Sequence, residues 1–553
     1  MSESSLARSS AVMALGTVAS RLLGFVRTST LTAVVGIGLA ADTFDVANTL
    51  PNQFYLLLAG GVLNAVLVPQ ITKAATHDDG GHEFVNRLLT ISFAVIAAAT
   101  VVITLLAPVL VRLFATQRWS DEAFGLATAF AFICLPQVLL YGLYTLLGQV
   151  LNARGHFAAY MWAPAVANVV AIAGLVVFRF SFGTEVPVGE WTGPMIWLLA
   201  GTATLGVAAQ ALVLVVPLRR IGFRYRPVWG FRGAGLGSAS RVALWTFAAL
   251  GVSQLGFVVT SQVLTRAGDL LDEAGVVGAG KAAYGVAFLL FMLPHSLITL
   301  SLVTALFTRM SQAAHAGRTG EVVDDVARGL KMPAVVLLPA TVAAVLLGAP
   351  AVRVAFPGNS PEQASAIAGV MVAMMVGLLP FGWLYLVQRV YYAYEDAKTP
   401  FYLQIVVTVV ATVVNLVAAV VPPERTGVVV GLGQTLSNTV AAVVGLWLLR
   451  RRLGSLRLRA TTQLYVRLAI ASVVGAVPTV AVVWVLRQVL PQDANGHLTW
   501  ASSVVVVVVG LGVLFPVALA VAHALRVREV ALLLDPVLRR VSARRGPGGG
   551  RTP

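Results

Sequence analysis

Charged residues, cysteine and catalytic motifs are scarce in this sequence. Only 11% of its 553 residues are Asp, Glu, Lys or Arg, whereas soluble domains carry about 25%. The single cysteine, Cys134, lies in an apolar run, so one chain can form neither an internal disulfide nor a thiolate metal cluster. There is no glycine-rich phosphate loop with a lysine and no HExxH zinc motif. These absences argue against a soluble protein and against an enzyme, and we expect no cofactor and no metal site.

Long apolar runs dominate the chain instead. Hydrophobic residues make up 58% of it, and the mean hydropathy is +0.85. A membrane β-barrel alternates apolar and polar residues in ~10-residue segments, but these runs stay apolar for about 20 residues, as a spanning helix requires. Fourteen such segments can be identified, from 9–35 to 499–525, with the seventh at 240–264. The sequence therefore predicts an all-α polytopic membrane protein.

The basic residues are distributed unevenly between the predicted loops. Lys and Arg number 39 against 23 Asp and Glu, which gives a net charge of +16. With the N-terminus inside, 29 of the 39 fall on the cytoplasmic side and 8 on the other, and Arg21 and Arg27 remain in the membrane. Because this is the positive-inside distribution, we expect both termini in the cytoplasm and no nucleic-acid partner. The basic loops are also suited to binding anionic membrane lipids.

A weak internal sequence repeat divides the chain into halves. Residues 139–157 and 381–401 are similar in character, and each is followed by an apolar run with one asparagine, Asn168 and Asn415. Parallel repeats of this kind place the substrate site of transporters between the halves. The predicted parts are a six-helix lobe at 1–217, a basic cytoplasmic linker at 218–239, a second six-helix lobe at 240–453, two additional helices at 454–525 and a basic cytoplasmic tail at 526–553.

The stretch from Ser20 to Gln70 carries polar residues that a lipid-facing helix would not. An arginine at the centre of a spanning helix costs roughly 2.5–3.5 kcal/mol on insertion scales unless it faces a partner or a wet cavity. Arg21 and Arg27 lie within seven residues of each other. Their guanidinium groups match phosphate oxygens bidentately, so the pattern indicates a polar cavity that an anion enters.

Each of these residues also has a structural interpretation. The two arginines could reach toward the interface or fix helix packing through Asp42. They share a cavity only if the helix bends, since six residues correspond to about 240° around an ideal helix. Gly24 between them makes a bend plausible. Asp42 either neutralises an arginine in one state of a transport cycle or forms a static structural pair.

The other polar residues leave alternatives open as well. Asp45 and Asn48 continue the helical face of Asp42, and either lines the cavity or makes a packing contact. Asn52 follows Pro51, where a helix bend is favoured over a direct contact. His295 could relay protons, but a histidine with its hydrogen bonds satisfied is favoured.

The N-terminal motifs resemble those of the MviN/MurJ family, which moves the lipid-linked peptidoglycan precursor lipid II across the bacterial inner membrane. The resemblance covers essentially the whole chain and is most specific in the first seventy residues. It is carried by SRLLGFVR at 20–27, ADTF at 41–44, LPN at 50–52, GGVLNA at 60–65, VP at 68–69, YYA at 391–393, Asp396 and KTP at 398–400.

The resemblance implies a fold of the multidrug/oligosaccharidyl-lipid/polysaccharide exporter superfamily, with two six-helix lobes around a central cavity and two extra C-terminal helices. It also implies a substrate site on the first two helices. Arg21 and Arg27 fall on the family's two first-helix arginines, and Asp42 on its second-helix aspartate. Tyr55 stands where the family has a third cavity arginine, shortly after Asn52. We expect these five residues to bind substrate.

The second half departs further from the family pattern. Leu289 and Met292, ahead of Pro294, stand where the family has an arginine and a glutamate. Some relatives bind sodium through carboxylates in this lobe. The predicted helices seven, eleven and twelve contain none, so no sodium site is expected. Asp42 and Asp45 remain the candidates for an ion pair that gates transport.

The predicted function is the flipping of lipid II (the undecaprenyl-pyrophosphate-linked disaccharide peptide) by alternating access in the bacterial plasma membrane. The expected partners are this lipid, anionic membrane lipids and cell-wall synthesis proteins. One alternative is a multidrug, organic-cation or other polyprenyl-linked oligosaccharide exporter of the same fold, although a cation exporter should have an acidic cavity. Another is a non-transporting membrane scaffold for cell-wall enzymes.

Overall fold

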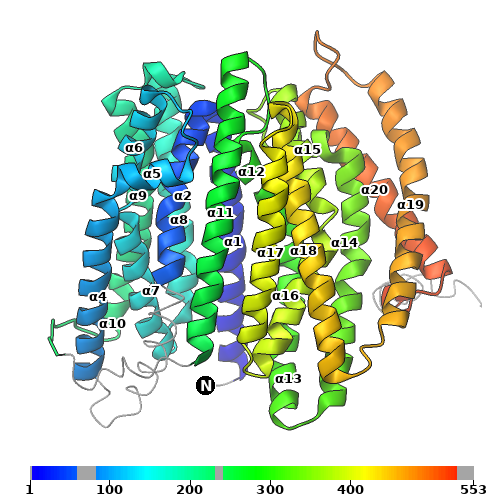
Figure 1. The fold of residues 1–553 in the computed structure, drawn as a ribbon, viewed down its shortest axis with the longest axis horizontal. Coiled ribbons are helices and arrows are strands. Elements are labelled where there is room, and N and C mark those ends of the chain that lie inside the picture. Colours follow the sequence, from blue (N-terminus) through cyan, green and yellow to red (C-terminus); the bar gives the residue numbers. More distant parts are fainter. Residues whose placement is uncertain (1–2, 59–81, 231–240, 532–553) are drawn as a thin grey trace, which may run out of the picture. The chain divides into compact units, whose positions relative to one another are not determined.

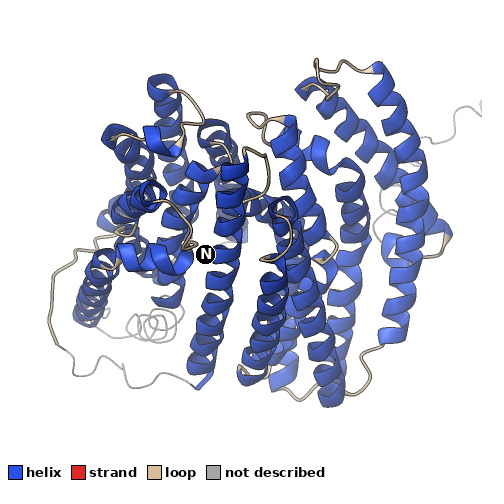
Figure 2. Ribbon diagram, turned by 45° about the horizontal axis from the view of Figure 1, so that its top comes forward, coloured by secondary structure: helices blue, strands red, loops and turns tan. Residues whose placement is uncertain are grey.

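The computed structural model describes residues 3–58, 82–230 and 241–531. Within these ranges the regular elements are helices (Figure 2), apart from one isolated antiparallel bridge between Gln492 and Leu498. This confirms the all-α fold class that the continuous apolar runs predicted. Part of the second predicted segment and the motif residues at 60–65 and 68–69 lie outside the described ranges.

The α-helices of the first part of the chain are labelled in Figure 1. They are α1 (Glu3–Val35), α2 (Leu39–Leu58), α4 (His82–Leu105), α5 (Ala107–Phe114), α6 (Asp121–Cys134), α7 (Gln137–Ala153), α8 (Phe157–Phe182), the short η2 (Val188–Glu190), α9 (Gly193–Leu212) and α10 (Val215–Arg220).

The remaining helices follow the basic linker. They are α11 (Arg241–Ala274), α12 (Lys281–Pro294), the π-helical η3 (His295–Leu300), α13 (Ser301–His315), α14 (Thr319–Ala355), α15 (Pro361–Met375), α16 (Leu378–Ala393), α17 (Lys398–Ala418), α18 (Pro423–Leu453), α19 (Leu458–Val489) and α20 (Trp500–Ala524).

Each of the fourteen predicted segments is mainly helical where it is described, with non-helical residues that include 135–136, 213–214 and 277–280. Eleven helical stretches of the described residues are long and apolar enough to cross a membrane, or twelve if α15 and α16, bent by 48° at their junction, form one span. The helices α1 and α2 are not among them. Since α2 carries Asp42, Asp45 and Asn48 within its 20 residues, its polar content sets it apart from an ordinary lipid-facing span.

The chain divides into two compact units. The first comprises residues 1–286, 355–367 and 397–433, and the second comprises 287–354, 368–396 and 434–553. In the first unit a large apolar core gathers residues of α2, α5, α6, α8 and α9. Phe130 is fully buried in this core and packs edge-on against both Phe44 and Trp191. This core fixes α2, and with it the polar residues on that helix.

Two local structures support the predicted internal repeat. After α7 the His156 N–H donates to the Leu151 carbonyl, and after α16 the Asp396 N–H donates to the Tyr391 carbonyl, both at 2.9 Å. The helices that follow also use their asparagines alike. Asn168 on α8 donates to the Ser20 carbonyl of α1 at 3.1 Å.

In the same way, Asn415 on α17 donates to Thr260 Oγ1 of α11 at 2.9 Å. Both asparagines therefore make hydrogen bonds between helices. The asparagine of α17 bonds α11 just as the asparagine of α8 bonds α1. In the predicted repeat, α11 is therefore the counterpart of α1.

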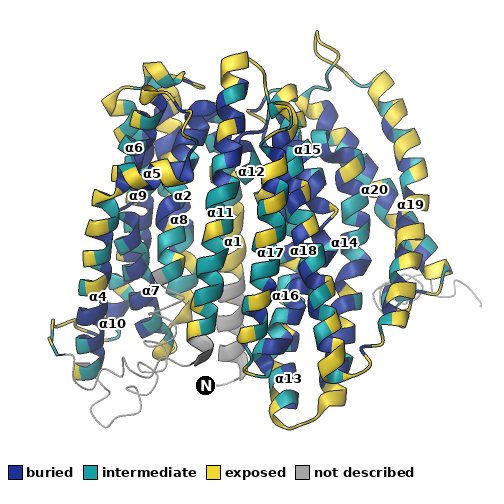
Figure 3. Ribbon diagram, viewed as in Figure 1, coloured by how far each residue is buried: buried dark blue, intermediate teal, exposed yellow. Residues whose placement is uncertain are grey.

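The two additional C-terminal helices, α19 and α20, pack closely together in the second unit. A Cβ at Gly475 would lie 3.0 Å from the Leu514 carbonyl oxygen, so the absence of a side chain allows the backbones to approach. Val477 and Trp484 on α19 are 68% and 64% exposed, and Figure 3 shows exposed residues along much of that helix. Such apolar side chains suit a surface that faces lipid.

Candidate functional site

Arg27 borders a small, partly open cavity of the first unit. The cavity measures about 40 Å³, which is room for roughly one or two waters. Its lining comes from four helices: Arg27 and Leu31 of α1, Phe44 and Asn48 of α2, Ala171 and Leu175 of α8, and Leu199, Thr202 and Ala203 of α9. The side chain of Arg27 is exposed, and the ion pairs among the described residues do not include it.

Arg21 lies on the same continuous helix, is exposed, and does not line that cavity. Arg21 and Arg27 are therefore both accessible on α1, and Arg27 alone borders this small cavity. Gly24 between them faces the amide of Asn168, whose Nδ2 would lie 3.5 Å from an added Cβ. A Cβ at this position would therefore make an ordinary van der Waals contact with Asn168, so the packing of α8 against α1 does not require a glycine here.

Tyr55 and Tyr141 extend the polar surface from Arg27 along α2 and α7. The Tyr55 hydroxyl lies 2.5 Å from Thr145 Oγ1, and its ring centroid is 5.5 Å from that of Tyr141. Tyr141 also interacts electrostatically with Arg27. Asn52 is exposed on the same helix as Tyr55.

Asp42 of α2 is fully buried against the first residues of α12, a helix that is distant from α2 in the sequence. Its Oδ1 accepts a hydrogen bond from the Ala282 N–H at 2.7 Å, and it is 0% exposed. An added Cβ at either Gly268 or Gly280 would clash with the carboxylate. Asp42 therefore caps α12 from another helix, where the positive end of the helix dipole favours a negative charge.

Asp45, one turn after Asp42 on α2, also contacts the beginning of α12. Its Oδ2 lies 2.6 Å from Lys281 Nζ, the first residue of α12. Lys281 is only 5% exposed, and its ammonium also lies 5.2 Å from the centre of the Phe257 ring. In the sequence, Lys281 stands at the start of an apolar run, and nothing there indicates Asp45 as its partner.

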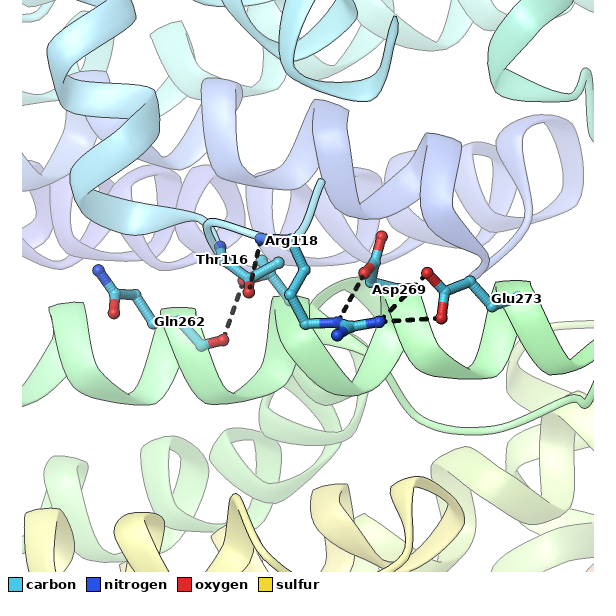
Figure 4. A network of polar contacts seen from close by, with 6 residues as sticks. Thr116, Arg118, Gln262, Asp269 and Glu273 are labelled. Carbon is cyan, nitrogen blue, oxygen red and sulfur yellow. Dashed lines mark hydrogen bonds and ion pairs between the residues drawn. The ribbon is translucent and has the colours of Figure 1, made fainter. Parts of the chain in front are cut away.

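A second group of polar contacts joins α11 to the turn between α5 and α6 (Figure 4). Arg118 Nε lies 3.4 Å from Asp269 Oδ2, and its Nη2 lies 3.0 Å from Glu273 Oε2. The Thr116 N–H donates to Thr265 Oγ1 at 2.8 Å. Asp42 and Asp45 contact α12, and Thr116 and Arg118 contact α11. We call this set of contacts the α2–α11 corner.

The helix α11 extends beyond its predicted end. The apolar run stops at Val263–Leu264, but the helix continues to Ala274 and includes Asp269 and Glu273. The prediction that helices seven and twelve contain no carboxylate was therefore wrong, since α18 (helix twelve) also begins with Glu424 in its first turn. Hydropathy does not detect polar terminal turns. Among the described residues no group of three or more His, Cys, Asp or Glu could hold a metal ion.

In the second unit, α12 ends in a local irregularity at His295. Leu289 and Met292 precede Pro294, and the six residues from His295 form a π-helical turn, a feature frequent at functional sites. The His295 ring packs edge-on against Phe381, with centroids 4.5 Å apart. Its Nδ1 is buried without a hydrogen-bond partner in the described part of the chain, which differs from the satisfied histidine that was favoured.

Comparisons with known proteins agree with this architecture. A family model described as "Lipid II flippase MurJ" matches residues 31–509. A probable lipid II flippase MurJ of Rhizobium tropici is 26% identical over 425 residues, covering 74% of this chain and 75% of that protein. One of Vibrio cholerae is 25% identical over 554 residues, covering 95% and 97%.

Solved structures give the same fold. A lipid II flippase MurJ in an inward closed conformation has a TM-score of 0.69 at 15% identity and covers 95% of this chain and 99% of that one. An inward-facing multidrug resistance MATE family transporter of the MOP superfamily has a TM-score of 0.57 at 18% identity, covering 79% and 95%. At these identities the two likenesses bear on the fold alone.

Proposed function

The chain belongs to the lipid II flippase MurJ family, and we propose that it moves lipid II from the cytoplasmic to the outer leaflet of the bacterial inner membrane by alternating access. The observation that carries this proposal is the family match over 31–509, which favours a flippase over a cation exporter or a scaffold. The proposed function of the protein is therefore transport and not catalysis.

Arg27 and Arg21 are the proposed ligands of the pyrophosphate. Both guanidinium groups are exposed on α1, and planar guanidinium forks match phosphate oxygens. Tyr55 and the exposed Asn52 would contact the adjoining sugar on the same polar surface. The pyrophosphate would then be bound by protein side chains and would not contact the lipid tails. The acyl chain can therefore stay in the bilayer while the head group crosses.

The α2–α11 corner is the proposed outer gate. In the orientation expected from the basic loops, with both termini in the cytoplasm, these contacts lie toward the outer face. They tie the lobe at 1–217 to the first two helices, α11 and α12, of the lobe at 240–453. If the lobes rock to expose the substrate outside, the cap at Asp42 and the pairs of Asp45 and Arg118 must open.

The membrane potential can drive such a cycle. With the inside negative, outward movement of negative charge gains about 2.3 kcal/mol per charge per 100 mV. The same field favours the return of an empty, cationic site to the inner face. A cycle without ATP is therefore physically possible, and anionic lipids and cell-wall synthesis proteins are its proposed partners.

A sidedness assay tests the proposal. Purified protein is reconstituted with labelled lipid II, and the head group that becomes accessible to an external enzyme is measured over time. Arg27→Ala and Arg21→Ala should abolish the transfer, whereas Arg179→Ala, an exposed arginine at the end of α8, should retain it. Transfer that survives both α1 substitutions would contradict the assigned site, and the absence of transfer by the native protein would favour the scaffold.

A further inference from the structure

The first part of the basic linker is fixed along α4. The Arg226 N–H donates to Asn86 Oδ1 at 3.3 Å, and the Val228 N–H donates to Thr90 Oγ1 at 3.2 Å. The Tyr225 hydroxyl lies 2.9 Å from the same Thr90 oxygen. Asn86 and Thr90 are both buried. Two buried polar side chains of α4 thus hold the linker in an extended path against the first unit.

The docked linker forms one wall of a groove. The cavity measures about 670 Å³, within the range of roughly 300–1,000 Å³ that small-molecule sites occupy. Its apolar lining consists of Leu89 and Phe93 of α4, Leu143, Leu146 and Leu147 of α7, Val215 and Leu218 of α10, and Phe223 of the linker. The polar lining residues are Arg219, Arg224 and Tyr225. None of these residues lines the Arg27 cavity.

The two arginines give the groove a positive charge without a matching carboxylate. Both side chains are exposed, and neither takes part in an ion pair among the described residues. The same linker also exposes Tyr225 and Trp229, at 48% and 67%. Exposed Trp and Tyr are typical of the level of the lipid head groups, which places the groove where phospholipid phosphates lie.

We propose that this groove binds one anionic diacyl phospholipid of the surrounding membrane. Its phosphate would lie between Arg219 and Arg224, and part of one acyl chain would lie along α4 and α7. Charge complementarity selects an anionic head group, since each basic residue near a membrane surface attracts anionic lipid. The apolar floor selects a lipid over free phosphate. The inference does not depend on the proposed flippase function.

Binding of phosphatidylglycerol to the full-length, delipidated protein in detergent tests the proposal. Native mass spectrometry resolves each bound lipid, and phosphatidylcholine serves as the zwitterionic comparison. The test variant is Arg219→Gln with Arg224→Gln. The matched control is Arg220→Gln with Arg226→Gln, which removes the same charge from the same linker at residues that do not line the groove. A third variant, Leu143→Trp, fills the apolar floor and keeps both arginines.

We expect phosphatidylglycerol to bind at least about tenfold more tightly than phosphatidylcholine, with the preference lost in the test variant and kept in the control. Leu143→Trp should weaken phosphatidylglycerol binding while thermal unfolding stays cooperative. Equal losses in the test and control variants would overturn the proposal, because diffuse surface charge would then explain the binding. Displacement of the lipid by inorganic phosphate, or by undecaprenyl pyrophosphate at equal concentration, would also overturn it.

Discussion

Replacing Arg118 with glutamine should open the α2–α11 corner more than any change at Glu273. The Glu273 side chain is 59% exposed, so solvent screens its ion pair, which contributes about 0–1 kcal/mol. The Asp269 side chain is only 7% exposed, and a fully buried carboxylate that loses its cation costs roughly 3–5 kcal/mol. Because Arg118 is itself 45% exposed, we expect a discounted cost of about 1–2 kcal/mol.

Cysteine labelling can measure this cost. The single native cysteine, Cys134, is buried and can be replaced with serine. Ser261→Cys then provides a reporter on α11, because Ser261 is 1% exposed and lies one turn before Thr265. A cost of 1–2 kcal/mol in the closed state corresponds to a roughly 5–30-fold larger open population. Labelling by a membrane-impermeant maleimide should accelerate by that factor in Arg118→Gln.

Two further variants test whether the buried charge of Asp269 causes the faster labelling. Glu273→Gln should change the labelling rate little, since its pair is screened. Adding Asp269→Asn to Arg118→Gln should restore slow labelling, because a neutral amide no longer leaves a buried charge unpaired. An unchanged rate in Arg118→Gln, or an equal acceleration in Glu273→Gln, would refute the assignment of the corner as a gate closed by Asp269 and Arg118.

Two further predictions concern Asp42 and the paired asparagines. Asp42→Ala should accelerate the same labelling, because the α12 N-terminus loses a cap that contributes about 0.5–2 kcal/mol, and Asp42→Asn, which keeps an acceptor oxygen, should do so less. Equal rates for both variants would argue against a capping role. Asn168→Ala and Asn415→Ala should each lower the free energy of unfolding by about 0.6 kcal/mol and at most about 1.7 kcal/mol. Thermal unfolding in detergent checks this, and a loss in only one variant would count against equivalent roles.

The fold was predictable because lipid imposes simple rules. Backbone groups in a bilayer must be satisfied within helices, so long apolar runs such as 499–525 could be assigned to helices directly. Charge placement then gave the expected orientation. The end of α11 was missed for the same reason, since its last turns carry Asp269 and Glu273 and no longer read as apolar.

The contacts of the candidate site were less predictable. Arg21, Arg27 and Asp42 could be singled out because a charge inside a membrane is costly. Their partners depend on packing between helices that are distant in sequence. Nothing near Asp42 indicates that it caps a helix beginning at Lys281, or that Gly280 leaves room for its carboxylate. Sequence identified the unusual side chains, and only the structure assigned their neighbours.

Equilibrium binding of the polyprenyl ligand tests the central claim most directly. Undecaprenyl pyrophosphate and uncharged undecaprenol share the acyl chain and differ in the group that Arg27 is proposed to hold. The native protein should bind the pyrophosphate at least about tenfold more tightly, and Arg27→Ala should remove most of that preference. A preference for pyrophosphate that is unchanged in Arg27→Ala would contradict the account.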